Sequence, residues 1–307
     1  MAKSNNLLIQ DIKVRPEIQA RVEMSDEVVD AYADRAVLSC HSAGLNPFME
    51  AVVRTLGECG MKAVYEKSAG ETRRKEGLPD AQGFLGGEEP FPWEFREGKA
   101  RFRAHPDRGQ KTGFYLDFRP ARRRVFETAR GIRVLDAFCY QGATSIQAVL
   151  GGASSVLALD SSEEALRLGR EDARLNGVED VCEFRRADCF DALQEMSRSG
   201  DAFDLVVLDP PPLARSVHDL PKAGIAMRRL MAQGMNLLRP GGRLLAAACS
   251  HHMDWRILEE AVAGACGGSG RRFILAERLF QPPDHPVLVG VPETEYLRAV
   301  ILQEVRS

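Results

Sequence analysis

No apolar run in the 307-residue sequence approaches the length of about 18 residues that a membrane-spanning helix requires. The first residues also lack the apolar core and cleavage site of a secretory signal, so we expect a cytoplasmic protein with no membrane association. The seven cysteines are odd in number and form no CxxC pair, which indicates neither a disulfide framework nor a metal site. Hydrophobic residues make up 44% and charged residues 28%, as is typical of a folded globular chain.

The formal net charge is small, but one segment is strongly basic. The whole chain carries a net charge of -3, whereas residues 95–135 hold twelve basic and four acidic side chains and therefore +8. The remainder sums to -11, because -3 minus 8 is -11. Such a segment either binds phosphates or forms a solvated helix face, and both interpretations stay open.

The N-terminal third of the chain predicts a small α/β domain. Residues 36–40 and 62–67 have the pattern of strands, and residues 46–59 between them have the pattern of a helix with proline at its first turn. A loop is expected over 68–92, followed by a hairpin that turns at Glu97 and Gly98. We therefore expect an N-terminal extension over 1–35, a small α/β domain over 36–108 and a larger domain over 109–307.

The larger domain alternates apolar strands with helical segments. Residues 132–138, 155–160, 182–188, 203–209 and 243–249 have the pattern of strands. This alternation predicts an α/β fold with a Rossmann-like, doubly wound, mostly parallel sheet. The apolar runs 272–280 and 296–305 have no helix-length segment between them, so they add a C-terminal antiparallel pair and complete seven strands.

Polar residues recur where these strands end, namely Asp136, Asp160, Asp188, Asp209 and Cys249. An open parallel sheet binds its ligand beyond the carboxyl ends of its strands, although each aspartate alone could simply cap the next helix. The loop after the first strand has one glycine where a dinucleotide site needs three, which disfavours a nicotinamide cofactor. S-adenosyl-L-methionine fits better, with its sulfonium near the first carboxylate, its ribose at the second and its adenine amino group at the third.

Several stretches carry a more specific resemblance. The chain resembles the class I S-adenosylmethionine-dependent methyltransferases, and within them the RlmI-like ribosomal RNA large-subunit methyltransferases, many of which form 5-methylcytosine. The resemblance spans residues 36–305 and rests on the stretches 109–119 (GQKTGFYLDFR), 134–145 (VLDAFCYQGATS), 159–166 (LDSSEEAL), 187–191 (ADCFD), 203–216 (FDLVVLDPPPLARS), 238–242 with 248–253 (LRPGG and ACSHHM) and 281–297 (QPPDHPVLVGVPETEYL). The RNA-binding PUA domain of the family is not recognisable in the first 35 residues. Leu213 stands where the family commonly has an aromatic residue.

The resemblance implies a set of site residues. Cys249 and Asp209 are the implied catalytic residues. The implied cofactor-binding residues are Tyr115, Asp136, Phe138, Gly142, Asp160, Ser161, Asp188, Cys189, Asp209 and Pro210. The implied substrate-binding residues are Lys111, Arg119, Pro211 and His285.

The implied reaction is methylation of an RNA cytosine, with ribosomal RNA as the expected partner. A Cys249 thiolate would add to carbon 6 of the base, and Asp209 would hold the exocyclic amine of a base that has left its stack. Alternatively, Cys249 is a small buried residue that closes an apolar strand. The chain could then methylate another base position or a small molecule, or bind RNA without catalysis. A homodimer also stays open.

Overall fold

A computed structural model describes residues 21–24, 27–214, 216–250 and 252–305. Residues 1–20, most of the expected N-terminal extension, lie outside the described residues. The chain divides into two compact units. The first contains Met1–Leu116 with Pro283–Pro286, and the second contains Asp117–Pro282 with Val287–Ser307.

The first unit is built on a five-stranded sheet with the strand order β1-β2-β3-β4-β5. Its elements are β1 (Arg21–Met24), β2 (Glu27–Tyr32), β3 (Arg35–Cys40), the short 3-10 helix η1 (Asn46–Phe48), α2 (Met49–Glu58), β4 (Ala63–Ser68), α3 (Glu71–Lys75) and β5 (Ala81–Gly86). Strands β3 and β4 are parallel, and the other neighbours are antiparallel. The expected hairpin is present as β6 (Trp93–Glu97) and β7 (Ala100–Ala104).

The expectation of a loop over residues 68–92 was wrong. This segment contains α3 and β5, and β5 pairs with β4. Its glycines and charged residues hide the strand pattern, but Phe84 packs against the rings of Tyr65 and Phe91 at centroid distances of 5.1 and 5.4 Å. Packing against aromatic rings from other segments therefore stabilises β5.

The second unit is the expected doubly wound sheet of seven strands, with the order β10-β9-β8-β11-β12-β14-β13. Its elements are the 3-10 helix η2 (Leu116–Phe118), α4 (Arg119–Thr128), β8 (Arg133–Ala137), α5 (Ala143–Leu150), β9 (Ser155–Asp160), α6 (Glu163–Asn176), β10 (Cys182–Arg186), α7 (Cys189–Ser199), β11 (Phe203–Leu208), η3 (Val217–Asp219), α8 (Leu220–Asn236), β12 (Leu238–Cys249), α9 (Trp255–Ser269), β13 (Phe273–Phe280), η4 (Pro292–Thr294) and β14 (Leu297–Glu304). Strands β8 to β12 are parallel, and β13 and β14 form the expected C-terminal antiparallel pair.

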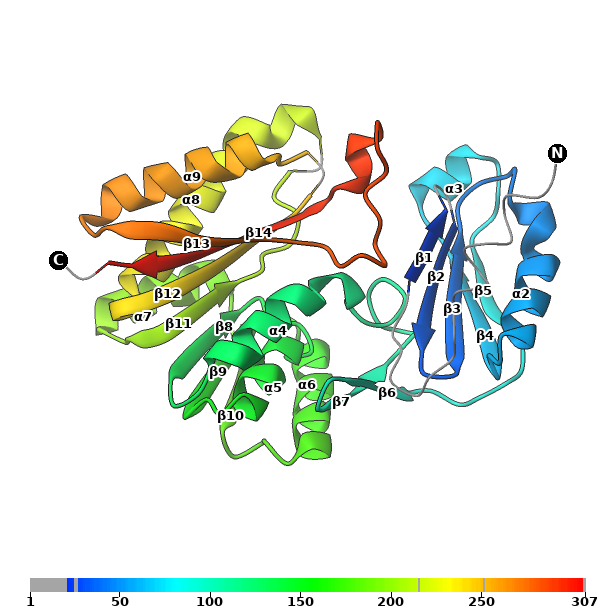
Figure 1. Cartoon of the computed structure of the whole chain (residues 1–307), viewed down its shortest axis with the longest axis horizontal. Coiled ribbons are helices and arrows are strands. Elements are labelled where there is room, and N and C mark those ends of the chain that lie inside the picture. The colour runs from blue at the N-terminus through cyan, green and yellow to red at the C-terminus, as the bar shows by residue number, and fades with distance from the viewer. Residues whose placement is uncertain (1–20, 25–26, 215, 251, 306–307) are drawn as a thin grey trace. The chain divides into compact units, whose positions relative to one another are not determined.

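Helices cover both faces of this sheet (Figure 1). Helices α4, α5 and α6 pack on one face, and α7, α8 and α9 pack together on the other. The strand order reverses between β8 and β11, so the crevice of a doubly wound fold opens at their carboxyl ends. None of the helices in the described part of the chain is long and apolar enough to cross a membrane.

Candidate active site

The register of the parallel strands brings the polar residues to one edge of the sheet. Leu208 at the end of β11 pairs with Ala137 at the end of β8, so Asp209 follows directly at that edge. Cys249 is the last residue of β12, and Asp160 is the last residue of β9. Residues far apart in the sequence are therefore neighbours at the carboxyl end of the sheet.

Asp160 fixes the loop that follows β8. Its two carboxylate oxygens accept hydrogen bonds from the backbone N–H groups of Tyr140 and Ser162, each at 2.9 Å. Phe138 and Tyr140 adopt left-handed backbone angles, with φ of 64° and 50°. A carboxylate has further lone pairs, so a partly exposed Asp160 can still accept from a ribose diol.

Gly142 is required at the end of the same loop. Its φ is 66°, and a Cβ added there would lie 2.3 Å from a ring carbon of Phe184. The close approach of backbone and ring leaves no room for a side chain, so glycine alone satisfies both constraints. This residue closes the loop at the N-terminus of α5.

Asp136 is buried in the fold. Its side chain is 2% exposed, and the Ser145 hydroxyl donates to its Oδ2 at 2.6 Å. Burial raises the pKa of Asp136 to about 7, and the charges of Asp209 and Asp160 add to this effect. A salt link from this carboxyl to a sulfonium stays a prediction.

Asp188 and Cys189, at the start of α7, have different surroundings. The exposed carboxylate of Asp188 caps α7 by accepting from the N–H groups of Phe190 and Asp191, at 2.9 and 3.2 Å. Cys189 is buried, accepts from the Phe138 N–H at 3.3 Å, and has a pKa raised to about 12 by burial. Asp188 therefore caps α7, and Cys189 supports the loop that follows β8. Ser161 is exposed beside Asp160.

Cys249 and Asp209 are in direct contact. The thiol donates to Oδ1 of Asp209 at 3.2 Å, and both residues are half-buried. Cys249 also lines a small hollow, together with Pro210, Pro211, Leu213, Met227, Ala248, Ser250 and Met253. The Ser250 hydroxyl donates to the Ala214 carbonyl at 3.0 Å, so the loops after β11 and β12 are tied together.

Three of the expected residues belong to the first unit. The ammonium of Lys111 lies 4.4 Å from the centroid of the Tyr115 ring, and the Tyr115 hydroxyl bonds to Gln110. The third is His285, which is 2% exposed and lies 3.1 Å from the Asp284 carboxylate. Arg119 begins α4 in the second unit.

Much of the basic segment is engaged within the protein. Arg122 is buried, and Arg123 and Arg124 both pair with Glu127. Arg124 also pairs with Glu277 on β13 at 2.7 Å. These contacts support the interpretation of the basic side chains of α4 as a helix face. Fewer cations are left to bind phosphates than the sequence count suggests.

The sequence interpretation missed the partners that hold the acidic residues in place. Ser145 binds Asp136, and the signal was a hydroxyl residue in the first turn of the following helix. The hydrogen bonds that Asp160 accepts come from backbone N–H groups, so no residue type in the sequence indicates them. The resulting set of residues, with a carboxylate beside a fixed loop and a second exposed carboxylate one strand away, suits the hydroxyls and amine of an adenosyl group.

Comparison with known proteins shows the family of the chain. A family model of S-adenosylmethionine-dependent methyltransferases matches residues 47–302. The chain belongs to this methyltransferase family. S-adenosylmethionine is therefore the cofactor of this methyltransferase.

Curated relatives of the methyltransferase carry a more specific name. The ribosomal RNA large subunit methyltransferase I of Aeromonas hydrophila is 37% identical over 282 residues, which cover 90% of this chain and 70% of the relative. The protein of the same name from Shewanella amazonensis is 36% identical over 276 residues, covering 89% of this chain and 70% of the relative.

Solved structures share the fold of the methyltransferase. A methyltransferase complexed with SAH has a TM-score of 0.81 at 21% identity, covering 95% of this chain and 76% of that one. A SAM-dependent methyltransferase from Streptococcus mutans has a TM-score of 0.80 at 20% identity, covering 96% of this chain and 76% of that one.

Proposed function

We propose that the enzyme methylates carbon 5 of a cytosine in large-subunit ribosomal RNA through a covalent adduct with Cys249. The curated relatives bear the name of ribosomal RNA large subunit methyltransferases. The observation that carries the chemistry is the 3.2 Å contact between the Cys249 thiol and the Asp209 carboxylate at the carboxyl edge of the sheet. A thiol and an acceptor in contact at the reactive edge are the parts that nucleophilic catalysis needs.

Carbon 5 of cytosine is a poor nucleophile, so it must be activated before it can accept a methyl group. Cys249 loses its proton to the adjacent carboxylate and its sulfur bonds to carbon 6, which moves electron density to carbon 5. Carbon 5 then takes the methyl group that S-adenosylmethionine supplies as an electrophile, and S-adenosylhomocysteine remains. A base removes the proton from carbon 5, the double bond re-forms, and the Cys249 thiolate leaves.

The neighbouring residues orient the two reactants. Pro210 and Pro211 stiffen the loop after Asp209, so its carboxylate keeps its place for the exocyclic amine of the base. The base must leave its stack to reach Cys249 and Asp209. On the cofactor side, Asp160 would bind the ribose hydroxyls and Asp188 the adenine amine, beside the loop that contains Phe138 and Gly142. Tyr115, Ser161 and Cys189 would border this site, and Lys111, Arg119 and His285 would contact RNA.

The test is an assay with labelled cofactor. The purified enzyme is incubated with methyl-labelled S-adenosylmethionine and unmethylated large-subunit ribosomal RNA, and the labelled nucleoside is identified by mass spectrometry. We expect the label in 5-methylcytidine. Label in any other nucleoside would refute the cytosine-5 chemistry, and a failure to label RNA would refute the RNA substrate. Cytoplasmic residence and a homodimer stay predictions.

A further inference from the structure

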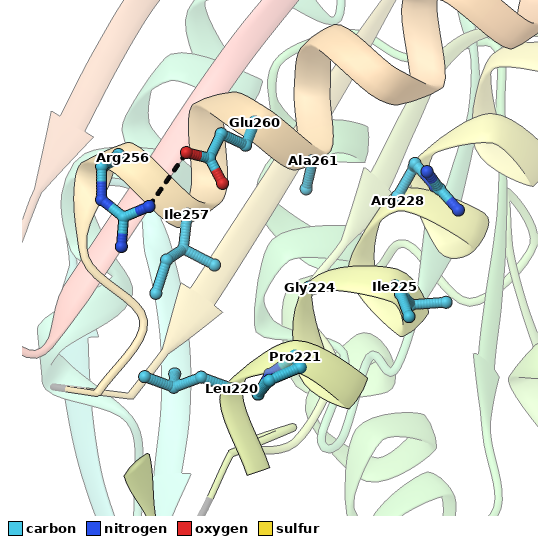
Figure 2. A pocket seen from close by; sticks show the side chains of 9 residues that line it. All are labelled: Leu220, Pro221, Gly224, Ile225, Arg228, Arg256, Ile257, Glu260 and Ala261. Carbon is cyan, nitrogen blue, oxygen red and sulfur yellow. Dashed lines mark hydrogen bonds and ion pairs between the residues drawn. The ribbon is translucent and has the colours of Figure 1, made fainter. Parts of the chain in front are cut away.

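A groove lies between the first half of α8 and the first half of α9 (Figure 2). Its volume is about 370 Å³, within the range of sites that hold a small organic group. Apolar side chains and two arginines line it; the lining residues are Leu220, Pro221, Gly224, Ile225, Arg228, Arg256, Ile257, Glu260 and Ala261. Ile225 is 58% exposed, so its side chain is accessible to a ligand in the groove.

The groove adjoins the hollow that contains Cys249. Met227 of α8 lines the hollow, and its neighbour Arg228 lines the groove, together with Gly224 one turn earlier. The hollow and the groove therefore share α8 as a wall. Only the short segment between Cys249 and Trp255 connects the catalytic strand to the other wall, α9.

The stem of Arg228 at one end of the groove packs over a glycine of α9. A Cβ added at Gly264 would lie 2.5 Å from Cδ of Arg228, so a side chain there would displace the arginine stem. Arg228 forms no ion pair with any residue in the described part of the chain. Toward the other end, Arg256 pairs with Glu260 at 2.9 Å (Figure 2). An unpaired guanidinium beside an apolar wall suits a phosphate linked to a flat ring.

From this geometry we infer that the groove binds a nucleotide of the substrate strand that flanks the target cytosine. Its base lies against Ile225 and Ile257, and its phosphate pairs with Arg228. The assignment rests on the proposed RNA substrate. The nucleotide beside the target base would then be anchored on α8, the same helix that lines the hollow beside Cys249.

Substitution of Arg228 tests this contact. For Arg228→Ala we expect the KM for ribosomal RNA to rise about tenfold, with kcat and the KM for S-adenosylmethionine unchanged, and the salt dependence of RNA binding to weaken by about one phosphate contact. Arg229→Ala removes an exposed arginine from the same helix outside the groove and should change the KM less than about twofold. An equal effect of both variants would overturn the assignment.

The Gly264→Ala substitution tests the position of Arg228 separately from its charge. It keeps every charge and favours the α9 helix, but displaces the Arg228 stem, so the KM for RNA should rise without loss of stability. An unchanged KM would contradict the role of Arg228. If the wild-type enzyme methylates no RNA, the proposed function fails; if it does and these variants match it, only this inference fails.

A photocrosslink identifies the occupant directly. A photoreactive amino acid at Ile225 should crosslink, in the full-length enzyme, to a nucleotide within two positions of the methylated cytosine. Crosslinks to a distant nucleotide, or to a second copy of the chain, would contradict the inference.

Discussion

The two halves of the carboxyl edge of the sheet are built differently. On the β8–β10 side, Asp160 and Asp188 accept hydrogen bonds from backbone N–H groups, and Gly142 forms a left-handed turn. On the β11–β12 side, Asp209 and Cys249 contact each other through their side chains, beside two prolines. In the proposed function, the first half would bind the cofactor and the second would supply the reactive groups. Substitutions should therefore affect binding and stability on one side and chemistry on the other.

The largest effect is expected on the chemical side. Cys249→Ala should lower kcat by at least about a thousandfold, because the nucleophile is lost, with S-adenosylmethionine affinity changed less than about twofold. Single-turnover methylation and calorimetry measure the two quantities. Cys266→Ala, a partly buried cysteine of α9, is the matched control and should keep its activity. Unchanged turnover in Cys249→Ala would exclude the covalent route.

Gly142→Ala should give the largest loss of stability on the cofactor side. The added Cβ meets the Phe184 ring at 2.3 Å and the backbone is left-handed, so we expect a loss of about 3 kcal/mol in the free energy of unfolding. Gly177→Ala has the same φ of 66° and open space around the added atom, and should cost about 1 kcal/mol. Urea denaturation compares them. Equal losses would show that the Phe184 contact is unimportant.

The buried Asp136 predicts a pH dependence. Its pKa in the folded protein, about 7, lies above the ordinary value of 3.8, so protonation favours folding. The stabilisation is complete below about pH 4 and is lost as the pH rises to about 7. Relative to Asp136→Asn, the wild-type free energy of unfolding should fall by about 2–3 kcal/mol between pH 5 and pH 8. Parallel stability curves for the two proteins would contradict this account.

A smaller effect is expected from Asp160. Asp160→Ala should weaken S-adenosylmethionine binding about tenfold, because the ribose acceptor and the anchor of the Tyr140 loop are both lost. Calorimetry measures the affinity, with Asp180→Ala as a control at an exposed aspartate in the turn before β10. If kcat at saturating cofactor also collapsed in Asp160→Ala, the division between a binding half and a chemical half would be wrong.

The sequence predicted the large sheet well because buried parallel strands have continuous apolar runs. The runs that end near Asp136, Asp160 and Asp209 each became a strand with nearly the expected bounds. Their parallel, doubly wound arrangement was predicted from the alternation with helices, whereas the strand order was not. The antiparallel C-terminal pair was also predictable, because too few residues separate its strands for a helical crossover.

The features of the structure that the sequence did not predict depend on contacts between residues far apart in the chain. Strand β5 was missed because packing of Phe84 on Tyr65 outweighs its glycines. The surroundings of Asp136 were missed because a strand-end aspartate has the same signature whether it faces a ligand or Ser145. The groove beside Arg228 was missed because its two walls come from helices that the sequence does not align with one another.

The central claim is the bond between Cys249 and the target base, and RNA containing 5-fluorocytidine at the methylated position tests it most directly. Fluorine cannot leave carbon 5 as a proton does, so the adduct should persist in the presence of S-adenosylmethionine. We predict a protein–RNA adduct whose linked peptide contains Cys249, and none with Cys249→Ala. Methyl transfer to normal RNA without any adduct on the fluorinated RNA, or an adduct at another cysteine, would contradict the account.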